Sequence, residues 1–142
     1  MNATAEKFGY PDSLIKEYQH WLVLARPQQV TLGSLVLVCK EPVTRFSDVS
    51  RAAFTALREA IAAIEATLSG LYKYQKINYL MLMMVDPDVH YHVIPRYDCA
   101  RSFSGQQVLD HGWPAAPALG EFVEFDAEAR AQLIAALQAA WR

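Results

Sequence analysis

The chain has 142 residues, of which 53% are hydrophobic, and a formal net charge of -2. This length supports one domain with a proper core and is too short for two domains of ordinary size. The sequence contains no Lys/Arg-rich run of the kind that marks a nucleic-acid partner, and no apolar run approaches the roughly 18 residues that span a bilayer. Cys39 and Cys99 form no metal-binding or redox pair. We therefore expect a cytoplasmic protein with no membrane segment.

The first part of the chain is expected to form a short helix and then two strands. Pro11-Asp12-Ser13 resembles a helix cap and predicts a short helix that carries Leu14 and Tyr18. The β-rich run Trp21–Leu24 predicts a strand, and a second strand is expected from Gly33 to Cys39. Their short connection predicts an antiparallel pair.

A long amphipathic helix is predicted over residues 47–69, where apolar side chains recur at steps of three and four. Ser69-Gly70 supplies a stop signal. The apolar run Ile77–Val85 then predicts a buried central strand, and Asp86-Pro87 a turn. The strand that follows is expected to return antiparallel beside it.

The rest of the chain is expected to be mostly loop and then a terminal helix. Residues 97–120 are rich in Gly and Pro and predict a loop, with room for one short strand, that is placed to cover a site. Asp126 is expected to cap a final helix with an apolar stripe. The fold class is therefore α+β: one domain over residues 1–142, with an antiparallel sheet, one long helix packed on it and terminal helices.

The most informative segment is the predicted strand that follows the turn, which reads Asp88-Val-His90-Tyr-His92-Val-Ile-Pro-Arg96. Because successive side chains of a strand alternate between faces, Asp88, His90 and His92 share one face. Side chains two residues apart on a strand lie about 7 Å from each other, so one phosphate group can touch both histidines.

This pattern resembles the signature of the histidine triad (HIT) family, in which three histidines alternate with hydrophobic residues and a Pro-Arg pair often follows. His92 then corresponds to the third histidine and His90 to the central one, and Asp88 stands at the place of the first. The early strand also resembles the family, with Gly33 preceding Ser34 where a histidine is usual. The order of elements from Trp21 to Tyr97 agrees with a HIT-like fold.

The resemblance implies a nucleotide hydrolase or transferase that acts on a phosphoramidate or a dinucleoside polyphosphate. His90 would attack the α-phosphorus and form a covalent nucleotidyl-histidine. His92 would stabilise the phosphoryl oxygens and help protonate the leaving group. The main-chain carbonyl of Asp88 would orient His90. We expect substrate contacts from Asp88, Arg96 and Ser34, with a structural or interface role as the favoured alternative for Arg96.

The resemblance further implies a homodimer whose sheets join across the interface, with Tyr91 and Trp141 as large side chains that such an interface could bury. The substrate partner is a small nucleotide. Neither a nucleic-acid polymer nor a membrane is expected as a partner, and neither a cofactor nor a metal is expected in the site.

Two alternatives follow from departures from the family pattern. The replacements at Asp88 and Ser34, together with the short passage through Asp86-Pro87 in place of a Gly- and Gln-containing phosphate loop, favour a nucleotide-binding protein with weak or no activity. Asp88, His90 and His92 also supply the two imidazoles and one carboxylate of a non-haem iron site. The residues around them fit the spacing of such metal enzymes poorly.

Overall fold

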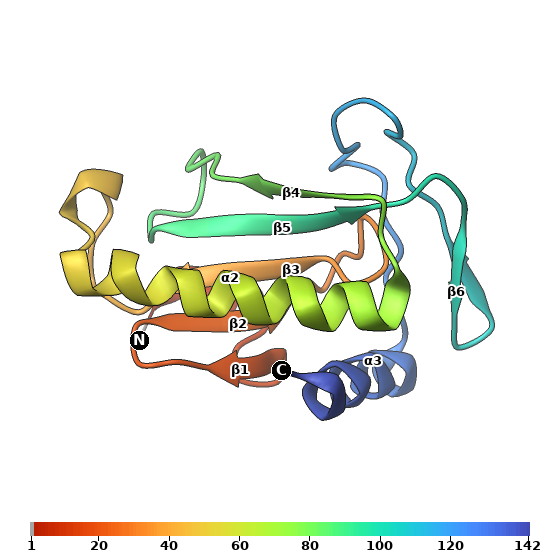
Figure 1. Ribbon diagram of the computed structural model, residues 1–142, viewed down its shortest axis with the longest axis horizontal. Coiled ribbons are helices and arrows are strands. Elements are labelled where there is room, and N and C mark those ends of the chain that lie inside the picture. Colours follow the sequence, from red (N-terminus) through yellow and green to blue (C-terminus); the bar gives the residue numbers. More distant parts are fainter. Residues whose placement is uncertain (1) are drawn as a thin grey trace.

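An antiparallel sheet in the order β1-β2-β3-β5-β4 organises the protein (Figure 1). The computed structural model describes residues 2–142. The sheet strands are β1 Leu14–Glu17, β2 Trp21–Ala25, β3 Leu35–Cys39, β4 Lys76–Leu80 and β5 His90–Arg96. The remaining elements are helices α1 Ala3–Lys7, α2 Arg51–Tyr72 and α3 Ala127–Ala140, the 3-10 helix η1 Phe46–Asp48, and a hairpin of β6 Arg101–Phe103 and β7 Gln106–Val108. The α+β class predicted from the sequence is confirmed.

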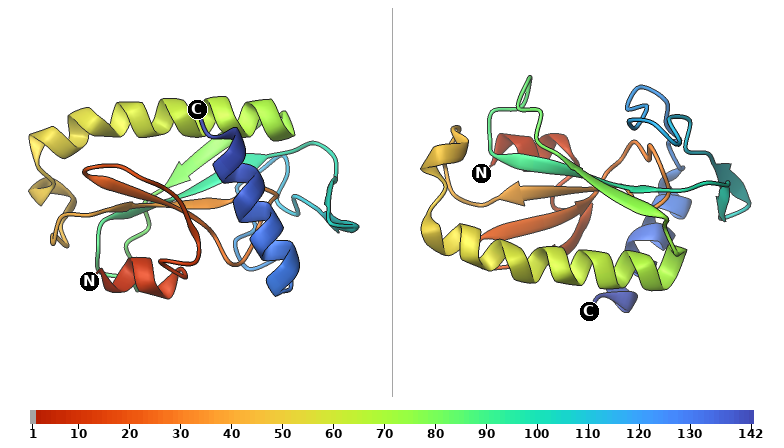
Figure 2. Two further views of the ribbon diagram at one scale, coloured as in Figure 1. Left: turned by 90° about the horizontal axis from the view of Figure 1, so that it is seen from below. Right: turned by 45° about the horizontal axis from the view of Figure 1, so that its top comes forward.

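The two faces of the sheet carry different helices, with α2 on one side of the strands and α1 on the other (Figure 2). Strand residues that face α2 pack with its buried stripe, which includes Ala60, Ile64 and Leu68. The opposite face is formed by alternate apolar residues of β2 and β3, and α1 and Phe8 cover it. His90 and His92 pair with Val38 and Val36, so both histidines belong to the α1 face.

The long helix forms as predicted but continues beyond its expected stop. Ser50 caps its start by accepting a hydrogen bond from the amide of Ala53 at 3.1 Å. The helix passes through Gly70 and ends where Lys73 adopts a left-handed conformation, with φ of 52°. A Cβ at Gly33 would lie 3.1 Å from the ring of Tyr72, so this helical turn packs closely on the sheet. Tertiary packing therefore outweighs the local stop signal of a glycine.

The predicted helix after Pro11 is wrong, because these residues form the edge strand β1. The Ser13 hydroxyl donates to the carbonyl of Phe8 at 2.7 Å, so it does not cap a helix that follows it. Leu14 to Glu17 instead pair with β2. The short helix lies earlier in the chain, as α1, and Asn2 caps it by accepting from the amide of Ala5 at 2.9 Å.

The predicted central strand Ile77–Val85 is also wrong in place and length. Its first part forms β4, an edge strand that ends at Leu80, and β5 lies inside the sheet between β4 and the central strand β3. Residues 81–89 leave the sheet, and Met83 has a positive φ of 52°. The antiparallel return of the motif strand is confirmed. An apolar run does not distinguish a buried strand from a strand end that continues as a loop.

The C-terminal part agrees with expectation. Residues 97–120 are mostly loop and also contain the β6–β7 hairpin. Asp126 caps α3 by accepting from the amide of Ala129 at 2.8 Å. Within residues 2–142, none of the helices has both the length and the hydropathy needed to cross a bilayer.

Candidate active site

The two histidines of β5 lie side by side on the α1 face of the sheet. Their ring centroids are 5.1 Å apart, and the planes are nearly perpendicular at 82°. His90 is 2% exposed and His92 is 7% exposed, so the surrounding protein fixes both rings. The alternation of the strand thus brings the two predicted catalytic residues together.

The ring of His90 is oriented by the main chain of its own strand. Its Nδ1 lies 2.7 Å from the carbonyl oxygen of Asp88. Because a carbonyl only accepts hydrogen bonds, Nδ1 carries the proton and Nε2 keeps its lone pair. This tautomer places the nucleophilic lone pair on the nitrogen that is free of the main chain.

Arg26, which the sequence analysis did not single out, lies against His92. The Nε of Arg26 is 3.4 Å from the Nδ1 of His92, and Arg26 follows directly after β2. The pKa of His92 is lowered to about 4, chiefly by burial, and further by the charge of Arg26 and by His90. His92 is therefore neutral at pH 7. An Arg-Pro pair at a strand end is the only signal in the sequence, and it does not reveal which face the arginine joins.

A cavity of about 210 Å³ opens next to both histidines. Phe8 covers it, with its ring centroid 6.1 Å from that of His90 and 5.6 Å from that of His92. Lys7 reaches over the same space to form an ion pair with Asp86 at 2.8 Å. The lining consists of the end of α1, the turn after β2, the loop after β4 and the two histidines: Lys7, Phe8, Arg26, Gln28, Leu82, Met83, Met84, Val85, Asp86, His90 and His92.

A second hollow of about 190 Å³ adjoins this cavity. The two share Lys7, Phe8, Arg26 and Gln28, and Glu124 borders the second one. Two cations, Arg26 and Lys7, and two carboxylates, Asp86 and Glu124, therefore border these hollows. Because Lys7 is paired with Asp86, Arg26 is the cation that can supply positive potential beside the histidines.

The carboxylate of Asp88 points away from the cavity, towards α1. It accepts a hydrogen bond from the amide of Thr4 at 3.1 Å, and the Asp88 amide donates to the Thr4 hydroxyl at 3.2 Å. The Asp88 carbonyl contacts His90, whereas the Asp88 carboxylate contacts Thr4 and lies outside the cavity lining. The same geometry removes the carboxylate from the iron-type ligand set, and residues 2–142 contain no group of three His, Cys, Asp or Glu arranged to hold a metal.

The other two expected substrate contacts, Arg96 and Ser34, are also placed outside the cavity. Arg96 is 3% exposed and binds both carboxylate oxygens of Asp110, at 2.8 and 3.0 Å, and the side-chain oxygen of Asn78 at 2.8 Å. Ser34 is buried and closes a turn by donating to the Thr31 carbonyl at 2.8 Å. Arg96 therefore contacts Asp110 and Asn78 and not the cavity, which agrees with the structural role given as its alternative. Ser34 contacts its own turn.

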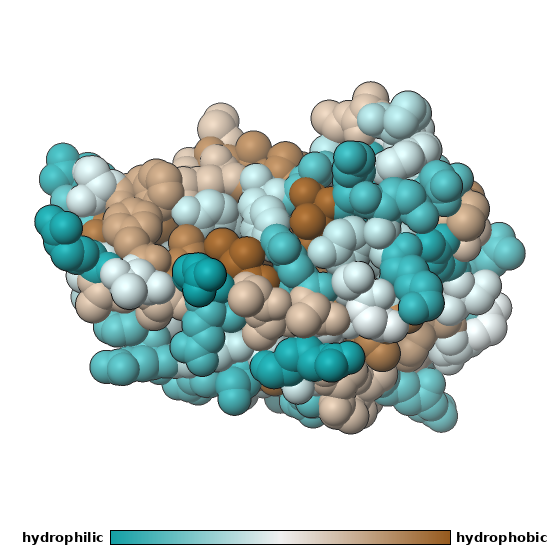
Figure 3. Space-filling model, viewed as in Figure 1, coloured by the Kyte–Doolittle hydropathy of each residue, from teal (hydrophilic) through white to brown (hydrophobic). Residues whose placement is uncertain are grey.

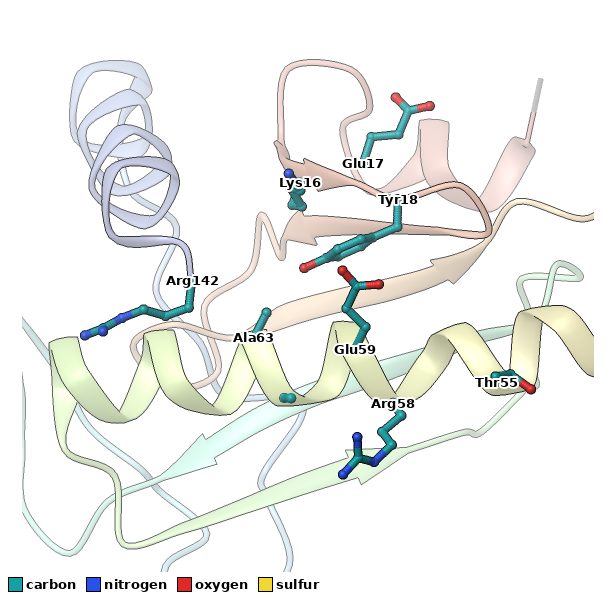
Figure 4. Close-up of a pocket in the computed structure, with 9 residues that line it drawn as sticks. Lys16, Glu17, Tyr18, Thr55, Arg58, Glu59, Ala63 and Arg142 are labelled. Carbon is teal, nitrogen blue, oxygen red and sulfur yellow. The ribbon is translucent and has the colours of Figure 1, made fainter.

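A larger hollow lies elsewhere, on the α2 side of the sheet. It measures about 820 Å³ and is bordered by β1, α2 and the C-terminal Arg142 (Figure 4). Its charged residues include Lys16, which extends from β1, and Arg58 and Glu59, which extend from α2. Its lining contains no histidine or cysteine, so the smaller cavity at the histidines is the candidate active site.

Comparison with solved structures identifies the fold. A histidine triad protein from Bradyrhizobium japonicum superposes on this chain with a TM-score of 0.75 at 20% sequence identity. The match covers all of this chain and 97% of that one. A histidine triad protein from Sinorhizobium meliloti gives 0.76 at 17% identity, covering 99% of this chain and 95% of its own. The protein therefore has the histidine triad fold, as its motif strand predicts.

A hypothetical histidine triad nucleotide-binding protein from Sulfolobus tokodaii also shares the fold. It gives a TM-score of 0.66 at 14% identity, and the match covers 90% of this chain and 82% of that one. No protein-family model and no curated protein sequence matches the chain. The family resemblance is thus carried by the three-dimensional structure and the motif strand.

Proposed function

We propose that the protein transfers a nucleotidyl group through His90, as a hydrolase or transferase of the HIT type. The observation that carries this proposal is the 2.7 Å contact between the His90 Nδ1 and the Asp88 carbonyl, which leaves Nε2 as a nucleophile. In this proposal Asp88 can stand at the place of the first histidine, because its main-chain carbonyl orients His90 and any side chain permits that role.

The surroundings of His90 support binding of a phosphate group. His92 is neutral and presents a proton on Nε2, so it is suited to donate to a phosphoryl oxygen. Arg26 and Lys7 border the same cavity and can offset the charge that develops in the transition state. The Sulfolobus tokodaii protein is a hypothetical nucleotide-binding protein, which agrees with this choice of ligand.

The proposal is tested by intact mass spectrometry after brief mixing with adenosine phosphoramidate or diadenosine triphosphate, quenched under conditions that preserve a phosphorus–nitrogen bond. An adenylyl adduct and release of AMP, both dependent on His90, are the expected results. Saturable AMP binding without adduct or release would instead support a nucleotide-binding protein with an inactive site. The short passage through Asp86-Pro87, in place of a Gly- and Gln-containing phosphate loop, is the feature that favours this second function.

We also propose a homodimer that forms at the β4 edge of the sheet. Beside this edge lies an apolar patch composed of Phe46, Phe54, Leu57, Ile61 and Tyr91 (Figure 3). Phe46 is 45% exposed and Phe54 is 40% exposed, while β4 pairs with β5 on one side only. Trp141, the other large side chain considered for an interface, instead donates to the Tyr18 hydroxyl at 2.9 Å.

Phe54→Glu is expected to convert the dimer to a monomer, because it places a charge within the apolar patch. Light scattering coupled to gel filtration measures the mass. Leu109→Glu is the matched control, since Leu109 is 47% exposed outside the patch, and it should leave the dimer intact. A wild-type chain that is monomeric at micromolar concentration would contradict the proposal.

A further inference from the structure

Arg26 is held in a fixed position behind His92. It is 9% exposed, and its Nη1 donates to the carbonyl of Gln28 at 2.8 Å while its Nε faces His92 at 3.4 Å. Two nitrogens of the guanidinium, Nε and Nη1, therefore have hydrogen-bond partners. The group also lines the cavity beside both histidines. A residue that only filled space would not need this orientation.

The contact defines the protonation state of His92. A guanidinium has donors and no acceptor, so the Nδ1 of His92 must offer a lone pair, and the ring proton must lie on Nε2. If His92 were an imidazolium, its Nδ1–H would face the Nε–H of Arg26. The other charged or titratable groups that face His92 are Lys7, His90 and Asp86, and only Asp86 favours a second proton. Asp86 is itself paired with Lys7 at 2.8 Å.

Building on the proposed nucleotidyl transfer, we propose that Arg26 is a positioning residue that holds His92 as a neutral hydrogen-bond donor. The site then acts on nucleotidyl anhydrides, whose leaving group departs as an oxyanion, in preference to phosphoramidates, whose nitrogen must be protonated as it leaves. The pKa of His92, lowered to about 4, agrees with this geometry.

The bond changes of the anhydride reaction balance without a proton from His92. The lone pair of the His90 Nε2 forms a bond to phosphorus, and the electron pair of the phosphorus–oxygen bond leaves with the departing oxygen. A phosphate oxygen holds that charge near neutral pH, since its second pKa is about 6. In the second step a water oxygen attacks phosphorus, the phosphorus–nitrogen bond breaks towards the Nε2 of His90, and the proton of water goes to solvent.

A phosphoramidate places a different demand on the same residues. Breaking its phosphorus–nitrogen bond without a proton would expel an amide anion, which is too basic to leave. An imidazolium at His92 would supply that proton, but a neutral imidazole is a far weaker acid. Arg26, together with the burial of the ring, therefore separates the two substrate classes by suppressing the acid form of His92.

The test compares kcat/KM for diadenosine triphosphate and adenosine phosphoramidate between pH 5 and 8. The wild type should favour the anhydride by about 10²-fold, at the lower end of what general acid catalysis contributes. Arg26→Gln removes the charge and should narrow this ratio about tenfold or more, through a faster phosphoramidate reaction below the ordinary histidine pKa of about 6.5. Arg26→Lys retains the charge and should stay near the wild-type ratio, as should the control Arg130→Gln on the exposed surface of α3.

An NMR titration of the histidine rings gives a readout that does not depend on turnover. His92 should remain neutral until the pH approaches about 4 in the wild type, and its pKa should rise in Arg26→Gln. Two results would overturn this inference: a ratio of the two kcat/KM values that Arg26→Gln does not change, or a wild type that cleaves the phosphoramidate as fast as the anhydride. If an adduct still formed on His90, the proposed function would remain. The absence of adduct and AMP with both substrates would overturn the proposed function itself.

Discussion

His90→Ala should abolish nucleotidyl transfer, with kcat/KM falling by at least about 10⁴-fold and no adduct detectable by mass. The physical reason lies in the residues that line the cavity within the described range 2–142. Among them, His90 alone has one ring nitrogen bound to a main-chain carbonyl, which leaves the lone pair on its other ring nitrogen. Removing the ring leaves the phosphate-binding groups in place but removes the atom that forms the bond. The measurement is a pre-steady-state and steady-state assay of AMP release.

Because His90 is buried against Phe8, its removal also alters packing, so a second variant is needed. His90→Asn keeps a polar group that can donate to the Asp88 carbonyl, and it should be equally inactive with little change in Tm. His111→Ala is the control, because that side chain is 41% exposed and lies outside the cavity. Turnover by His90→Asn at a rate close to that of the wild type would refute the role of His90.

Arg96→Met should lower the free energy of unfolding by about 3–5 kcal/mol, because it leaves the buried carboxylate of Asp110 without its partner. The side chains of Arg96 and Asp110 are 4% and 1% exposed. Burial alone would raise the pKa of Asp110, yet the hydrogen bonds from Arg96, Tyr97 and Gly112 keep that pKa below its usual value. This stabilisation is therefore present at neutral pH and is lost as the pH falls through the lowered pKa.

Denaturant unfolding of two further variants separates the ion pair from other effects. Arg96→Met combined with Asp110→Leu removes both charges and should recover much of the lost stability. Arg45→Met breaks a similar contact with Asp48, but the Arg45 side chain is 76% exposed, so the change should be within about 1 kcal/mol. If Arg96→Met raised the KM for nucleotide with no loss of stability, Arg96 would be a substrate ligand after all.

The sequence predicted the elements whose signals are local and periodic. The stripe of α2, the cap at Asp126 and the alternation of β5 each depend on residues close in the chain, and each was found where expected. Errors arose where tertiary contacts decide the outcome. Residues 14–17 became a strand through pairing with β2, and the helix passed Gly70 because Tyr72 packs on Gly33.

The candidate site was predictable in its histidines and unpredictable in its surroundings. Asp88, Ser34 and Arg96 were proposed as ligands from their place in the motif, but their side chains bind Thr4, Thr31 and Asp110 respectively. Arg26 and Lys7 reach the cavity from distant parts of the chain, and no spacing rule connects them to β5. The sequence shows which hydrogen-bonding and charged groups a polar side chain carries. The fold determines which other residues those groups contact.

Asp88 connects the candidate active site to helix α1. Its carbonyl accepts a hydrogen bond from the ring of His90, and its carboxylate accepts one from the amide of Thr4 in α1. One residue therefore joins the proposed nucleophile to the N-terminal helix. Any tag, truncation or bound partner that pulls α1 from the sheet would also strain the peptide group that aims the attacking nitrogen and lift Phe8 from both imidazoles. The position of an affinity tag is thus an experimental variable in every activity measurement on this protein, and a C-terminal tag is the better choice.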